Sequence, residues 1–197
     1  MVGRAVRLLV LRGADRSGHG AVFRFPSPGS DVSIRERHTV KGIDMSQFET
    51  TLAKMGVTLP DAPAPAANYV PYVQAGDMLY VSGQIAKDGE TLLVGKLGDD
   101  MDVPAGAAAA KVCAIALLAQ VKAACGGDLD RLVRVVKLTG FVNSTPDFME
   151  QPQVINGASD FIGEALGDAG KHARAAVSAA SLPFGVAVEI DGVFQIR

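Results

Sequence analysis

The feature that most limits the fold of this chain is an alanine-rich segment that is apolar on nearly every side. Pro104 suits the first turn of a helix, and Gly126-Gly127 can end it. Ten of the 21 residues from Ala105 to Cys125 are alanine, and the larger apolar side chains among them fall on several sides. We therefore expect other elements to cover this thin helix on more than one face.

The rest of residues 45–197 alternates β-rich runs with one amphipathic helix. Apolar residues on a single stripe predict a helix at 153–166, and Asn156 projects from the opposite side. Strands are predicted at residues 69–74, 78–84, 91–94, 132–142, 173–182 and 186–196. This order predicts an α+β fold in which two helices pack on one face of a sheet of about six strands.

Charge divides the chain after residue 44. Residues 1–44 carry a net charge of +4, whereas residues 45–197 carry −6. Beyond this point Ser46 can cap a short helix with Glu49 completing a capping box, and residues 59–67 form a proline/alanine connector. We predict a basic extension at 1–44, a short helix and connector at 45–67, and the main domain at 68–197. The extension is a segment upstream of a natural start at Met45, a flexible functional arm, or a targeting segment.

The sequence predicts a soluble protein without metal or cofactor. Gly, Asp, Lys or Gln interrupts every long apolar run before the ~18 residues of a membrane-spanning helix, so we expect no membrane partner. Cys113 and Cys125 lie on different sides of one predicted helix and cannot pair, which fits the reducing cytoplasm. His172 is the single histidine beyond residue 44, and no glycine-rich phosphate-binding motif occurs.

Two charged residues interrupt predicted strands that are otherwise small or apolar. Arg174 stands in HARAAV at 172–177, on a strand whose faces both look covered, where a guanidinium is costly unless it meets an anion. Glu189 interrupts VAVEI at 186–190. The two side chains could form a structural ion bridge. Alternatively, Arg174 binds a substrate carboxylate through paired hydrogen bonds and Glu189 accepts and donates protons.

A set of short motifs spans residues 68–197. They are YVQ at 72–74, LYVSGQ at 79–84, AR at 173–174, and LP at 182–183 followed by VEI at 188–190. Together they resemble the RidA/YjgF family of enamine/imine deaminases. GDL at 127–129, GFVN at 140–143 and VINGAS at 154–159 are similar to its branch labelled endoribonuclease L-PSP or chorismate mutase-like.

The resemblance implies a chorismate mutase-like α+β fold, a homotrimer, and sites in the clefts between subunits. It implies that Arg174 holds a substrate carboxylate and that Glu189 positions the attacking water. The other cleft residues that it implies are Tyr72, Ser82, Asn156 and Gly83, where the missing side chain would let a ligand approach the backbone. In one departure Ala176 stands where the family's deaminases often have cysteine.

These observations support two functions and disfavour a third. The first is hydrolysis of a reactive 2-enamine or 2-imine acid to ammonia and a 2-oxo acid. The second, motivated by Ala176, is a trimeric module that binds a small carboxylate and regulates without turnover. The ribonuclease of the family label is disfavoured, because residues 45–197 carry −6 and offer few cations to phosphates, so we expect no nucleic-acid partner.

Overall fold

Five of the predicted strands join in one mixed sheet. The computed structural model describes residues 46–63 and 68–197, so the extension expected at 1–44 and part of the connector lie outside the described residues. The strand order is β1-β2-β7-β5-β6; β5 and β6 run parallel, and the other neighbours are antiparallel. The bounds are β1 Tyr72–Ala75, β2 Met78–Ile85, β5 Leu132–Asn143, β6 Ala173–Ala179 and β7 Val188–Ile196.

The sixth predicted strand lies elsewhere. Residues 91–94 contribute β4 (Thr91–Leu92), which pairs with β3 (Lys87–Asp88) in a separate two-stranded ribbon. The main sheet therefore has five strands in the described part of the chain, where about six were expected. Turns follow the glycine signals: Gly76 and Gly89, which end β1 and β3, both adopt positive φ.

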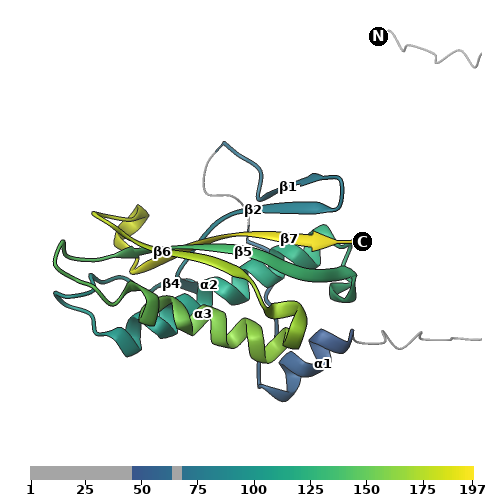
Figure 1. The fold of residues 1–197 in the computed structure, drawn as a ribbon, viewed down its shortest axis with the longest axis horizontal. Coiled ribbons are helices and arrows are strands. Elements are labelled where there is room, and N and C mark those ends of the chain that lie inside the picture. The colour runs from purple at the N-terminus through teal and green to yellow at the C-terminus, as the bar shows by residue number, and fades with distance from the viewer. Residues whose placement is uncertain (1–45, 64–67) are drawn as a thin grey trace, which may run out of the picture. The chain divides into compact units, whose positions relative to one another are not determined.

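Two long helices cover one face of this sheet (Figure 1). They are α2 (Val103–Ala124) and α3 (Gln151–Leu166); α2 contacts β7 and β2 on one side and α3 on another. A Cβ on Gly157 of α3 would overlap the backbone carbonyl of Ala107 in α2, so only glycine permits this close approach. The prediction that the alanine-rich helix is covered on more than one face is confirmed.

The apolar character of α2 bears on the expectation that polar residues interrupt every run long enough to span a membrane. By length and composition this helix could cross a membrane, since its most apolar 18-residue window has a mean hydropathy of 1.6. Half of that window is buried inside the fold, against α3 and the sheet. Its composition is therefore accounted for by its place in the core, and it is weak evidence for a membrane span.

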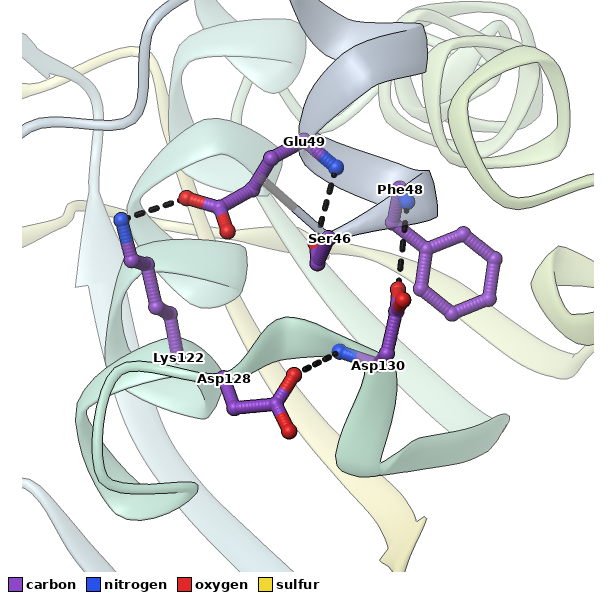
Figure 2. Close-up of polar contacts among 6 residues, drawn as sticks. All are labelled: Ser46, Phe48, Glu49, Lys122, Asp128 and Asp130. Carbon is purple, nitrogen blue, oxygen red and sulfur yellow. Dashed lines mark hydrogen bonds and ion pairs between the residues drawn. The ribbon is translucent and has the colours of Figure 1, made fainter. Parts of the chain in front are cut away.

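A third helix, α1 (Gln47–Lys54), contacts α2 and the turn before β5 through residues distant in the sequence (Figure 2). The Ser46 hydroxyl accepts from the Glu49 amide at 3.1 Å, as predicted. The Glu49 carboxylate pairs with Lys122 of α2 at 2.5 Å, so the capping box is only half formed. Asp130 provides a second cap, because its carboxylate accepts from the amides of Gln47 and Phe48. The pairing partners thus come from the main domain.

The edge strand β6 differs from its prediction. It ends at Ala179 and not at residue 182, and β5 is its single neighbouring strand among residues 46–63 and 68–197. All of its residues are half-buried or exposed, and Val177 is 44% exposed. The expectation that both faces of this strand are covered is therefore wrong for one chain.

The sheet has two unlike faces. Along β7, Val188, Ile190 and Phe194 are buried beneath the helices, and the residues between them are half-buried on the opposite face. No α-helix of residues 46–63 and 68–197 covers that opposite face (Figure 1), which we call the open face. By strand register it carries large exposed side chains, among them Val73 and Tyr80.

Candidate functional site

The first group of site residues lies where β6 meets α3. Arg174 Nη1 donates to Asn156 Oδ1 at 2.8 Å and to Ser159 Oγ at 3.0 Å, and Nη2 donates to the carbonyl of Pro152 at 3.4 Å. All three acceptors are neutral and belong to α3. Among the described residues, no carboxylate lies within ion-pair distance of Arg174. Its positive charge is therefore held in place without being neutralised.

Sequence reasoning found part of this group and missed part of it. Asn156 is exposed on α3, as its helical phase predicts, and the fold brings it to Arg174. Ser159 and His172 were missed, although each carried a signal. Ser159 follows Asn156 by one helical turn, and His172 precedes Arg174 by two residues on an extended segment, so each pair shares a face.

A hollow of about 370 Å³ adjoins Arg174. A second hollow of about 560 Å³ shares Lys171 and His172 with the first and is also lined by Arg134. Glu189 lines neither of them. The hollow beside Arg174 is lined by Ser159, Gly163, Gly170, Lys171, His172 and Arg174.

The second group of site residues lies on the open face, where β2 and β7 meet. The register between these strands shifts between Val81 and Gln84, so Ser82 and Gly83 form a bulge. A Cβ on Gly83 would overlap the carboxylate of Glu189, which lies directly against this glycine. The close approach that the sequence predicted for a ligand at Gly83 is made here by the Glu189 side chain.

The surroundings of Glu189 favour its protonated form. Burial raises the pKa of this carboxyl above its usual range, and the negative charge of Asp191, two residues along β7, raises it further. Within the described residues Glu189 forms no ion pair, so the alternative of a structural bridge to Arg174 is wrong for one chain. A half-buried carboxyl with a raised pKa is suited to accept a proton and to return it.

Arg174 and Glu189 lie on opposite faces of the sheet. Arg174 is aligned through Leu138 of β5 with Gly192 of β7, and both of these residues are buried on the helix side. Glu189 is three residues from Gly192, with no register shift between them, so its side chain points to the open face. The two positions are also two strands apart, about 10 Å across the sheet and about 10 Å along it.

The two remaining predicted residues are partly engaged by their own chain. The Ser82 hydroxyl donates to the carbonyl of Val70 at 2.9 Å. Tyr72 pairs with buried Val81 and packs against the core, on the helix side of β1. The fold therefore joins Arg174 with Asn156 in one group and Glu189 with Ser82 and Gly83 in another. Tyr72 lies on the strand paired with β2, with its side chain on the sheet face opposite that of Glu189.

Two other chemistries gain no support from the described residues. Nowhere in residues 46–63 and 68–197 do three His, Cys, Asp or Glu side chains gather closely enough to hold a metal ion. Cys113 is fully buried, and this burial strongly raises the pKa of its thiol, so it is held as an unreactive thiol.

The similarity of this chain to known proteins extends over both groups of site residues. The family model described as "YjgF/chorismate_mutase-like, putative endoribonuclease" matches residues 49–190, a span that includes Arg174 and Glu189. Protein TCP17 of Trypanosoma cruzi is 51% identical over 148 residues, which are 74% of this chain and 92% of that protein.

Two solved structures share both the fold and much of the sequence. The protein Atu1372 of Agrobacterium tumefaciens, described as having unknown function, is 50% identical with a TM-score of 0.72, covering 76% of this chain and 92% of that one. A "putative endoribonuclease" of Shewanella oneidensis is 33% identical with a TM-score of 0.73, covering 76% and 99%. The similarity therefore extends over nearly the full length of each of these proteins.

Proposed function

The chain belongs to the YjgF/chorismate mutase-like family, and we propose that it hydrolyses reactive 2-imino and 2-enamino carboxylic acids to 2-oxo acids and ammonia. The observation that carries the proposal is that the Arg174 guanidinium is hydrogen-bonded to neutral acceptors and has no ion-pair partner among the described residues. Its guanidinium is anchored by three neutral oxygens beside a hollow of about 370 Å³ and keeps its charge for an anion. A planar guanidinium matches a carboxylate through two parallel hydrogen bonds.

The reaction needs few groups. With the substrate carboxylate on Arg174, water adds to the carbon of the C=N bond to give a carbinolamine. Glu189 takes one proton from this water and gives it to the imine nitrogen as the C–O bond forms. It then takes the hydroxyl proton of the carbinolamine and gives it to the amine, so that the C–N bond breaks, ammonia leaves and the C=O bond forms. The raised pKa of Glu189 supports both directions of this transfer. An enamine substrate first gains a proton at its β-carbon and loses one from its nitrogen, which gives the imine.

We propose that the two groups of one working site come from different subunits of a homotrimer. In a 2-imino acid the reacting carbon is bonded to the carboxylate carbon, so Arg174 and the proton-transfer group must lie within a few ångströms of each other. On one chain they face opposite sides of the sheet. The open face, with exposed Val73 and Tyr80, supports a second copy packing there and bringing its own group to the first.

A non-catalytic function remains the second candidate because of Ala176. This residue shares the helix side of β6 with Arg174 and packs against the core, so the thiol common in the family's deaminases is missing there. A trimer that binds a small carboxylate at Arg174 without turnover would use the same anchor. In either case we propose a cytoplasmic protein whose partners are a small carboxylate and its own copies.

The test uses the purified full chain. The decay of 2-iminopropionate, generated in the assay by an amino-acid oxidase, should be faster with the protein than in buffer, and Glu189→Gln should remove most of the acceleration. Saturable thermal stabilisation by pyruvate without faster decay would favour the carboxylate-binding module. No acceleration and no stabilisation would contradict both. RNA cleavage that co-purifies with the trimer and disappears in Glu189→Gln would replace them with the nuclease of the family name.

A further inference from the structure

The anchor of Arg174 continues into a longer chain of hydrogen bonds. Ser159 Oγ, which accepts from Arg174 Nη1 at 3.0 Å, also lies 3.0 Å from His172 Nε2. On the other side of the ring, His172 Nδ1 lies 2.6 Å from the carbonyl oxygen of Gly170. The hydrogen bonds thus link the charged side chain of Arg174 to a backbone carbonyl, that of Gly170, through Ser159 and His172.

The donor and acceptor of each hydrogen bond follow from the Gly170 carbonyl at one end and the Arg174 guanidinium at the other. A carbonyl oxygen can only accept, so His172 Nδ1 carries the proton that it donates to Gly170. In the neutral ring Nε2 is then an acceptor, and the hydroxyl hydrogen of Ser159 points to it. The lone pairs of Ser159 Oγ are left for the N–H of Arg174. With the ring neutral, every hydrogen in these bonds has a defined place.

The backbone around Gly170 is built for this arrangement. A Cβ on Gly170 would lie 2.5 Å from the carbonyl oxygen of Ile162 in α3, so a side chain has no room there. This close contact between α3 and the turn η2 (Gly167–Gly170) fixes the carbonyl that orients His172. The support of Arg174 thus extends to the α3 backbone.

We propose that Ser159 and His172 are positioning residues, which hold the guanidinium of Arg174 in one orientation toward its anion. Arg174 has five N–H groups, of which three have acceptors on α3. Among the described residues Nε has no acceptor, and Nη2 has one acceptor for its two hydrogens. One N–H on Nε and one on Nη2 are therefore free. The chain through Ser159 keeps these two free for a carboxylate. This proposal rests on the proposed function only for its kinetic test.

The kinetic test compares hydroxyl and ring variants in the full-length protein. With 2-iminopropionate, Ser159→Ala and His172→Leu should each raise KM about tenfold, the cost of one hydrogen bond to a charged group, with little change in kcat. Ser159→Thr and His172→Gln, which keep the hydroxyl and the acceptor, should recover most of the loss. Ser178→Ala is the matched control, because this hydroxyl on β6 bonds to Ser144 and not to Arg174.

A spectroscopic test needs no turnover. Nitrogen-15 spectra of the His172 ring should show the proton on Nδ1, and the Nη signals of Arg174 should broaden through faster rotation in Ser159→Ala and His172→Leu but not in Ser178→Ala. A ring protonated on Nε2 alone, or unchanged Arg174 signals in both variants, would overturn the positioning proposal even if the protein is an active deaminase. The predicted spectra without turnover would keep it and reject only the deaminase.

Discussion

The two groups of site residues are built in opposite ways. Arg174 projects from an edge strand and is held by several long-range hydrogen bonds to a neighbouring helix, so its position depends on side chains. Glu189 projects from β7 within the sheet and lies against a glycine in a bulge, so its position depends on missing side-chain volume. One group is a fixed positive charge, and the other is a carboxyl whose pKa is raised.

This difference separates binding from proton transfer. A fixed cation that no carboxylate of the described residues neutralises is suited to hold an anion, whereas a carboxyl partly withdrawn from water is suited to change its protonation state. Because the two lie on opposite faces of one sheet, the proposed function gives a single chain only one half of each of two sites. Damage to each half should therefore have distinct consequences.

The largest loss of activity is expected from replacing Arg174. Arg174→Ala should lower kcat/KM for 2-iminopropionate by about a hundredfold or more, because a charged, paired hydrogen bond to the substrate is lost. Arg174→Lys, which keeps the charge and loses the planar fork, should fall between this variant and the wild type. Arg134→Ala, a neighbouring arginine on β5, is the control and should act like the wild type. Equal losses at both arginines would indicate a general charge effect.

A smaller effect is expected at the bulge. Gly83→Ala should lower kcat about tenfold, because the new methyl group displaces the Glu189 carboxylate, while the melting temperature changes little since only a flexible side chain has to move. The double variant with Glu189→Gln checks this cause. If the alanine acts through Glu189, the double variant is no slower than Glu189→Gln alone. Additive losses would assign Gly83 a separate contact.

The pH profile should report the charge of Asp191. If ionised Glu189 accepts the proton from water, kcat/KM rises with pH through the raised pKa of this carboxyl, above the range usual for glutamate. Asp191→Asn removes one cause of the shift, so the acid limb should move to lower pH. A limb that stays in place would show that another group controls it.

The same shift has a consequence for stability. A carboxyl whose pKa is raised by folding favours the folded state at low pH, and this contribution is lost as pH rises through its folded-state pKa. Glu189→Gln should therefore match the wild-type melting temperature at acid pH and exceed it above that pKa. Identical melting curves across the range would contradict the burial of this carboxyl.

The smallest effect is expected from removing residues 1–44. Both groups of site residues and the span of the family model lie beyond them, so the shortened protein should keep its kcat/KM and its oligomeric state. Size-exclusion chromatography and the imine assay check this. Loss of the oligomer on shortening would show that the division predicted from charge is wrong.

Local sequence patterns predicted most of the fold. The stripe of apolar residues located α3, and the β-rich runs located five sheet strands within a few residues. The predictions that were wrong concern residues whose partners are distant in the sequence. Glu49 binds Lys122 instead of closing the capping box, and the exposed edge position of β6 follows from strand order, which composition does not reveal.

The candidate site was predicted in its parts but not in its arrangement. Arg174 and Glu189 were found because each is a charge among small or apolar neighbours. Their placement on opposite faces depends on the register of three strands, and no local pattern contains it. Ser159 and His172 were missed because a serine on a helix and a single histidine are common where they have no function.

The central claim is that each working site combines Arg174 of one subunit with Glu189 of another. The most direct measurement co-expresses Arg174→Ala and Glu189→Gln chains, carrying different tags, and purifies the mixed oligomers. Every mixed trimer, whichever chain it holds twice, places an intact Arg174 opposite an intact Glu189 at one of its three interfaces, so about a third of wild-type activity should return, far above that of either parent. Mixed oligomers as inactive as their parents would contradict the account.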